Sequence, residues 1–289
     1  MSCMVKRNLK LYFRDKGAVF FSLLGVLIVV GLYFLFLGDT YNDSLKEFKN
    51  ADEMMSGWIV AGLLSITSLT TTMAAFSTVI VDKERKIFKD FYCAPVSRTS
   101  LTMGYIISSA LIGLIMTLVT LVLTMIYLVS KSAVTVTPIM ILELLGLSVI
   151  TSFANTSMAL FVVTLVNSEK AFSAITGVTS ALIGFITGIY IPVGNFPEAV
   201  QYVVKCFPTS HSAVLFRNIL MEENLKNCAE NFPKEAQDKA LTELKEVLGV
   251  TFKFGETECT TAVSIIIIVA TIVLFSVLAI FNLNRKKAK

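Results

Sequence analysis

The chain has 289 residues and a formal net charge of +4, with 55% apolar and only 16% charged residues. Soluble domains carry about 45–50% apolar and about 25% charged residues, so this composition excludes a disordered chain, a basic nucleic-acid-binding domain and an ordinary soluble enzyme. The apolar residues gather in six long runs separated by charged segments, a pattern typical of a polytopic helical membrane protein.

A membrane-spanning helix needs about 20 predominantly apolar residues because the hydrocarbon core is roughly 30 Å thick. Backbone amides in lipid must be satisfied within their own segment, so runs of this length form helices. We therefore predict an all-α integral membrane protein with six transmembrane helices, at residues 18–37, 58–81, 101–129, 138–166, 171–191 and 263–281. The first run is longer than the apolar part of a signal peptide, and we expect it to stay in the mature protein.

The charges of the loops predict the orientation. One side of the membrane carries 15 Lys and Arg against five acidic residues, and the other carries 10 against fifteen. Cytoplasmic loops are enriched in Lys and Arg, so the first side is cytoplasmic. Six crossings then place both the N and the C terminus in the cytoplasm of a cell (plasma) membrane protein.

Residues 1–17, before the first span, predict an amphipathic helix that lies along the cytoplasmic interface of the lipid bilayer. Apolar residues recur at helical spacing and form one face of the helix. Basic residues form the opposite face, which is suited to bind anionic headgroups. The apolar face holds Val5, Leu9, Tyr12 and Phe13, and the basic face holds Lys6, Arg7, Lys10 and Arg14. A disordered basic start is the alternative.

The loop at residues 82–100 predicts a second amphipathic helix, between spans two and three. Four neighbouring positions form an apolar and aromatic stripe among charged residues: Ile87, Phe88, Phe91 and Tyr92. Pro95 is expected to end this helix, and Ser97 or Ser100 to cap the next one. Such a helix can lie on the membrane or dock into a groove of a cytoplasmic partner.

Small and polar residues within the spans mark candidate functional positions. Ser65, Ser68 and Thr72 recur on span two and predict a mildly polar wall of a translocation path. Span five carries a small-residue seam, for which close helix packing is the favoured interpretation. The seam contains Ser173, Gly177, Ser180, Gly184 and Gly188.

Glu143 is the acidic residue that falls inside a predicted span. Ionisable groups in the membrane are functional candidates, which makes Glu143 a candidate contact for substrate or a cation along the path. It lies about two turns from the outer end, where a carboxylate can also snorkel to the interface or pair with Lys131.

The exoplasmic region, residues 192–260, starts with two short apolar pieces separated at Pro208. Residues 196–207 and 209–220 are each too short to cross, so we expect re-entrant-like helices that dip into the outer leaflet. Residues 221–260 are acidic and soluble in character, and we expect a small insertion without independent stability. Its helical stripe consists of Ala240, Leu241, Leu244, Val247 and Leu248.

Several kinds of catalytic or metal site are absent from the sequence. None of the fifteen glycines is followed by Lys, so the phosphate-binding G-x-x-x-x-G-K-[ST] loop cannot occur. The single histidine, His211, is expected to be an ordinary polar residue at the exoplasmic interface, and the cysteines lack metal-site spacing. A disulfide between Cys228 and Cys259 is possible in an oxidising space and stays open here.

Two stretches of the chain resemble a known family, the ABC-2 type transporter permeases. Residues 82–98, DKERKIFKDFYCAPVSR, resemble the loop that joins spans two and three in these permeases. Residues 188–197, GIYIPVGNFP, continuing through Phe207-Pro208-Thr209 to Arg217, are similar to the family's signature after span five. The basic start that ends in Arg14-Asp15-Lys16 is similar to its N terminus, so the resemblance covers essentially the whole chain.

The resemblance implies that residues 1–289 form a single ABC-2 type transmembrane domain, the permease half of an exporter. Such a permease works as a homodimer or heterodimer with two copies of a separate ABC ATPase, which binds the ATP and Mg²⁺. This chain would then bind no cofactor or metal and carry no catalytic residue. Residues 82–98 would be the coupling helix, with ATPase contacts at Glu84, Phe88, Phe91 and Tyr92. Spans two and five would flank the dimer axis.

The few charges within the spans favour an amphipathic or apolar substrate, such as a drug, a peptide antibiotic or a lipid, and we expect no nucleic-acid partner. A secondary transporter or channel is the main alternative, and it would show buried ionisable relays or a charged pore. An integral-membrane enzyme acting on lipids is a second alternative, which would need clustered His, Asp or Glu at one interface.

Overall fold

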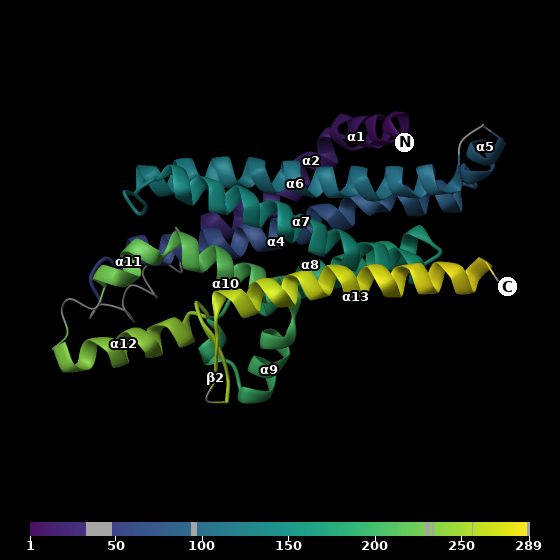
Figure 1. Ribbon diagram of the computed structural model, residues 1–289. Coiled ribbons are helices and arrows are strands. Elements are labelled where there is room, and N and C mark those ends of the chain that lie inside the picture. The colour runs from purple at the N-terminus through teal and green to yellow at the C-terminus, as the bar shows by residue number, and fades with distance from the viewer. Residues whose placement is uncertain (33–47, 94–96, 229–231, 233, 256, 288–289) are drawn as a thin grey trace.

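Long helices dominate the computed structural model, which describes residues 1–32, 48–93, 97–228, 232, 234–255 and 257–287 (Figure 1). The helices of the first half are α1 (Ser2–Arg14), α2 (Lys16–Leu32), α4 (Ala51–Glu84), α5 (Phe88–Cys93), α6 (Arg98–Ser130) and α7 (Pro138–Leu165). The second half contains α8 (Glu169–Ile186), η2 (Val193–Asn195), α9 (Glu198–Cys206), α10 (Pro208–Leu220), α11 (Glu222–Asn227), α12 (Lys234–Val247), β1 (Phe252–Phe254), β2 (Thr257–Cys259) and α13 (Thr261–Lys287).

Four of the described helices are long and apolar enough to cross a membrane, judged by length and composition. They are Ala51–Glu84, Thr99–Ser130, Pro138–Leu165 and Thr261–Asn282. These helices contain the predicted spans two, three and six, and the fourth apart from its last residue. The chain is therefore a helical membrane protein, as the composition indicated.

The other two predicted spans are matched in part. Helix α2 covers the start of residues 18–37, and residues 33–37 lie outside the described part of the chain. Helix α8 ends at Ile186, before the predicted end at residue 191, because the chain turns there with Gly188 at φ +69°. The backbone N–H groups of Ile189 and Tyr190 both donate to the carbonyl of Gly184 in this turn.

Three of the long helices begin at a hydroxyl side chain that satisfies a free backbone N–H group in the first turn. The hydroxyls of Ser97, Thr137 and Ser168 accept hydrogen bonds from the N–H groups of Ser100, Met140 and Ala171 at 3.2, 3.2 and 3.3 Å. Ser97 is thus the cap of the third predicted span. Pro95, expected to end the preceding helix, lies outside the described residues.

Helix α4 is the central helix of the bundle and packs against α6, α7, α8 and α10, while α13 covers α7 and α10. Many of the α4 side chains are Ser, Thr, Ala and Gly, which allow neighbouring helices to approach closely. Figure 1 shows α5 and the C terminus at one end of the bundle, and α11 and α12 at the other.

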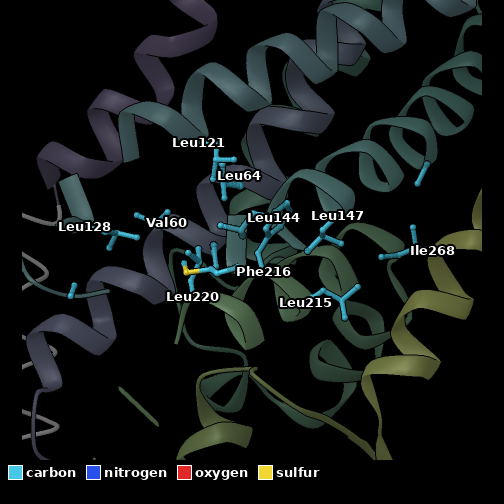
Figure 2. Close-up of a cluster of buried hydrophobic side chains, with 14 residues drawn as sticks. Val60, Leu64, Leu121, Leu128, Leu144, Leu147, Leu215, Phe216, Leu220 and Ile268 are labelled. Atoms are coloured by element: carbon cyan, nitrogen blue, oxygen red, sulfur yellow. The ribbon is translucent and has the colours of Figure 1, made fainter. Parts of the chain in front are cut away.

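Helix α10 enters the bundle from the predicted exoplasmic region. Figure 2 shows its Leu215, Phe216 and Leu220 within a cluster that also contains Leu64 of α4 and Leu144 of α7. The break at Pro208 is as predicted, since α9 ends at Cys206 and α10 begins at Pro208.

The insertion after α10 shares its core with the end of α4. Leu244 and Leu248 of the predicted stripe are buried in one cluster with Met54 and Trp58 of α4. The insertion therefore lacks a separate core, which agrees with its expected lack of independent stability.

Strands β1 and β2 are a small addition to the predicted all-α fold, which the helices confirm; they form a short antiparallel hairpin in which Phe252 pairs with Cys259. The turn between them contains Gly255 at φ +62°, a conformation that glycine adopts at little cost.

Candidate functional site

The loop after α4, predicted to be cytoplasmic, forms the expected short helix, α5. Helix α4 extends to Glu84, beyond the predicted end of span two, and the chain then reverses at Lys86, which adopts φ +60°. Helix α5 follows at once, from Phe88 to Cys93. The end of α4 and α5 are thus joined by three residues, which leaves little slack between them.

The aromatic face of α5 points into the protein. The rings of Phe88 and Phe91 are 6.4 Å apart, and Phe88 lies 5.6 Å from the ring of Tyr105 on α6. Both phenylalanines pack against a cluster that contains Met4 of α1 and Leu101 of α6. Their predicted role as direct ATPase contacts stays untested, but in this structure they attach α5 to its own chain. The Tyr92 side chain lies outside the described part.

The outward residues of this segment are charged, since Glu84, Arg85, Lys86 and Asp90 are all exposed. Glu84 has an internal partner as well, because its Oε2 accepts a 2.6 Å hydrogen bond from the backbone N–H of Glu169 at the start of α8. A carboxylate at this position also stabilises the positive end of the α8 dipole.

The neighbouring Lys83 binds the connection between α7 and α8. Its Nζ donates to Oδ1 of Asn167 at 2.6 Å and to the carbonyl of Val166 at 3.4 Å. This end of α4 is therefore attached to the start of α8 and, through three residues, to α5.

An ion pair joins α1 to the end of α4. The guanidinium of Arg7 donates to both carboxylate oxygens of Asp82, at 2.7 and 2.9 Å, and the Tyr105 hydroxyl donates to Asp82 Oδ2 at 2.5 Å. Hydrogen bonding to Asp82 raises the pKa of Arg7, which keeps the guanidinium charged. The prediction placed Arg7 on a face turned to lipid headgroups, whereas the structure pairs it within the protein.

Helix α1 forms as predicted, but the face that it buries was not recognised. Met4, Asn8 and Tyr12 are buried, at spacing i, i+4 and i+8, and Asn8 Nδ2 donates to Ser108 Oγ of α6 at 2.9 Å. Gly104 of α6 permits this contact, since a Cβ there would lie 2.8 Å from the Cβ of Met4. The sequence did contain an indication of this face: Asn8 lies between Met4 and Tyr12 at helical spacing, and a polar residue on an otherwise apolar face indicates a hydrogen bond to another helix. Contact of α1 with a membrane stays a prediction.

The predicted polar wall on span two lies inside the protomer. Ser65, Ser68 and Thr72 are each 0% exposed. Thr72 donates to the carbonyl of Ser68, and Ser68 Oγ accepts a 2.9 Å hydrogen bond from Asn155 Nδ2 of α7. Their role in translocation is untested, and this burial favours the alternative of helix packing.

A groove of about 330 Å³ opens beside this buried face, between the α1–α2 junction, α4 and α8. Its lining combines hydroxyl and apolar side chains with the carboxylate of Asp15: Leu11, Tyr12, Asp15, Ala18, Ala74, Ser77, Thr78, Phe172, Ser173 and Thr176. The buried Oγ1 of Thr176 has no hydrogen-bond partner among the described residues. The α4 residues of this lining, Ala74, Ser77 and Thr78, follow Thr72 of the predicted polar wall by two to six residues and were not among the predicted positions.

The small-residue seam of span five divides into two parts. Ser173, Gly177 and Ser180 are exposed, and a Cβ at Gly177 would meet no described atom within 4 Å. Gly184 instead lies against the chain's own Tyr190, whose ring would be 2.1 Å from a Cβ there. Gly188 serves the turn after α8. The first part of the seam therefore packs against no other described helix.

Glu143 lies on the outer face of α7, where Ile139 and Leu142 are 72% and 71% exposed. The exposed side chain is in the second turn of the helix, from which a carboxylate can reach the interface. We expect Glu143→Gln to leave ATP turnover of the assembled transporter within about twofold of wild type, because no buried site loses a charge. A larger loss, with protein yield unchanged, would assign Glu143 to the translocation path.

His211 is buried, not interfacial as predicted. Its Nε2 lies 2.8 Å from the carbonyl of Lys205, and its Nδ1 lies 3.1 Å from Ser264 Oγ on α13. A carbonyl oxygen only accepts hydrogen bonds, so Nε2 carries the proton and Nδ1 accepts from Ser264 in the neutral form. His211 thus attaches α10 to α13.

Arg217 of α10 is a fully buried cation that binds the carbonyls of Thr187 and Gly249, at 2.8 and 3.2 Å. Its guanidinium lies 5.0 Å from the ring of Trp58, whose Nε1 donates to the Leu248 carbonyl at 2.7 Å. Carbonyls at helix C-termini carry partial negative charge, and these two follow α8 and α12. Arg217 therefore joins the ends of both helices to α4.

The possible disulfide is not formed, because Cys228 and Cys259 are both free and buried. They belong to different clusters, Cys228 with Trp58 and Cys259 with Phe252. Burial raises the pKa of the Cys228 thiol, which lowers its reactivity.

The described residues form a bundle of apolar helices with the short helix α5 attached at one end, an arrangement expected of a multi-span membrane protein. A family model described as ABC-2 family transporter protein matches residues 38–281. The chain therefore belongs to the ABC-2 transporter family, as residues 82–98 and 188–217 had indicated. Proteins of this family are membrane components of ABC transporters and carry no ATPase of their own. A search among curated proteins found no match.

Proposed function

We propose that this chain is the permease subunit of an ATP-driven ABC exporter in the cell membrane, with both termini in the cytoplasm. Two copies, or this chain and a second permease, assemble with two copies of a separate ATPase that binds ATP and Mg²⁺. The observation that carries the proposal is the attachment of α5 to the ends of α1, α4 and α6, combined with the family match. An ATPase that displaces α5 would move these helices and bias the bundle between inward-open and outward-open states.

The open part of the α8 seam supports the dimer. Small residues on a lipid-exposed helix allow a second helix to approach closely, and Ser173, Gly177 and Ser180 offer such a face. The groove beside this face would then lie near the dimer axis. Its lining is mostly hydroxyl and apolar, and its one carboxylate, Asp15, accepts a hydrogen bond from the N–H of Ala18, so the groove suits an amphipathic or apolar substrate better than a strongly charged one.

A transporter without ATP coupling receives less support. It would need a relay of ionisable groups through the bundle. Among the described residues, the buried charged side chains are Asp82, paired with Arg7 at one end, and Arg217 near the other.

The test expresses the chain together with a candidate ABC ATPase, sought among the genes that neighbour its own, and measures co-purification and ATP turnover. Arg85→Glu with Lys86→Glu reverses the exposed charge beside α5, and we expect about tenfold less co-purified ATPase, or about 1.4 kcal/mol of binding free energy. Phe88→Ala with Phe91→Ala removes the inward face, and we expect the ATPase to bind while its turnover no longer responds to the permease.

Lys170→Glu is the matched control, since Lys170 is also an exposed cytoplasmic cation, at the start of α8. It should leave both readouts unchanged. Unaltered co-purification and turnover in both double variants, Arg85→Glu with Lys86→Glu and Phe88→Ala with Phe91→Ala, would refute coupling through α5.

A further inference from the structure

Asp82 is the point at which three helices meet. It lies in the last turn of α4, and its side chain is 3% exposed. Its carboxylate accepts two hydrogen bonds from Arg7 of α1 and one from Tyr105 of α6. Three charge-assisted hydrogen bonds satisfy this buried anion, and the two parallel bonds from Arg7 also fix the orientation of the guanidinium plane.

Helix α5 contacts both donors of this cluster. The Arg7 guanidinium lies 5.4 Å from the ring centre of Phe91, and Phe88 packs on Tyr105 at 5.6 Å. The contacts therefore form a ring: Phe91 of α5 contacts Arg7, Arg7 binds Asp82, Asp82 binds Tyr105, and Tyr105 contacts Phe88 of α5. No member of this ring can move far without breaking at least two contacts.

Separation of α1 from α4 would leave Asp82 as an unpaired charge in a buried position, which is strongly unfavourable. A second connection reinforces the first, because Asn8, the residue after Arg7, donates to Ser108, which lies about one turn beyond Tyr105 on α6. Two consecutive residues of α1 are thus fixed, Arg7 to α4 and Asn8 to α6.

We propose that Arg7, Asp82 and Tyr105 are positioning residues that join α1, the end of α4, α5 and the start of α6 into one rigid body. A displacement of α5 then moves α1 and the end of α4 together. This inference rests on the proposed function, in which an ATPase moves α5. It adds that the N-terminal helix belongs to the moving unit and is not a passive anchor on the membrane.

The first experiment measures ATP turnover in the complex of the permease and the ABC ATPase that co-purifies with it in the test of the proposed function. We expect Arg7→Ala and Asp82→Asn each to reduce permease-dependent turnover about tenfold, while the ATPase still co-purifies. The exchange of charges, Arg7→Asp with Asp82→Arg, should recover part of the loss. Lys10→Ala removes an exposed cation from the same helix and should have no effect. Normal turnover in a folded Arg7→Ala complex would overturn the inference.

The second experiment needs no disruptive variant. Spin labels replace two exposed residues, Lys6 on α1 and Asp90 on α5, in a background whose native cysteines are changed to alanine. The distance between the labels should be the same without nucleotide and with ATP plus vanadate. A label pair at Lys6 and Arg285, which lies at the end of α13, should change its distance. A changing Lys6–Asp90 distance, or no change in either pair, would overturn the inference.

The two proposals can fail separately. If the wild-type chain neither binds the ATPase nor alters its turnover, the proposed function fails. If the wild type couples normally while Arg7→Ala couples equally well or the Lys6–Asp90 distance changes, only the rigid body fails.

Discussion

Replacing Arg217 with alanine is expected to destabilise the protein by about 2–4 kcal/mol. The variant loses the hydrogen bonds to the carbonyls of Thr187 and Gly249, together with the stacking on Trp58. Both carbonyls would remain buried without the donor, and the lost side chain would leave a void. Removal of a buried charge offsets part of this loss. The measurement is the temperature at which the detergent-purified protein loses its monodisperse elution peak, with the yield per cell as a second readout.

Arg217→Lys should be more stable than Arg217→Ala but less stable than wild type. The guanidinium group is planar, binds two carbonyls and lies over the indole ring of Trp58, and a single ammonium group cannot make all of these contacts. Lys226→Ala is the matched control, since Lys226 forms an exposed pair with Glu222 and such pairs contribute about 0–1 kcal/mol. An Arg217→Ala protein as heat-resistant as wild type would show that the insertion is held by its apolar contacts alone.

Alanine at Gly113 is expected to force α4 and α6 apart at their crossing. A Cβ at this position would lie 2.1 Å from Oγ1 of Thr72, which is fully buried and hydrogen-bonded to the Ser68 carbonyl. Overpacking of this kind costs about 1–3 kcal/mol. The measurement is the same melting temperature in detergent.

The second substitution, Thr72→Ala, removes the obstructing hydroxyl, so the double variant should be more stable than Gly113→Ala alone. Coupling of this sign identifies a direct contact, because distant substitutions add. Gly146→Ala is a control, as a Cβ there would meet no described atom within 4 Å. If the changes in melting temperature of Gly113→Ala and Thr72→Ala simply add in the double variant, the two residues are not in direct contact. That result would favour the prediction that Thr72 lines the translocation path.

The long helices could be predicted from the sequence because the bilayer imposes a minimum length on every apolar segment. The break at Pro208 and the cap at Ser97 were also predictable, since a proline lacks the backbone donor and a hydroxyl satisfies a free N–H. The hairpin of β1 and β2 was missed, although Gly255 marks its turn. Its strands have only three residues each, too few for a periodic pattern.

The sequence could not show which side of each helix faces its neighbours. A helix that is apolar on all sides has no polar face to show which side meets lipid and which meets a neighbouring helix. Ser65 and Thr72 were therefore interpreted as part of a path; that role stays a prediction, and the structure shows both side chains buried among the helices of this chain. The partners of Arg7 and Arg217 lie 75 and 32 residues away, beyond the range of any local pattern. Chain order alone could not show that Phe88 and Phe91 turn inward.

Helix α4 carries Asp82 at one end and Trp58 near the other, about 36 Å apart at 1.5 Å per residue. The first is bonded to α1 and the second to the turn after α12. A tilt of α4 would therefore move both attachment points at the same time. A displacement of the loop after Glu84 would reach the turn after α12 through one continuous helix, without a series of intermediate side-chain contacts.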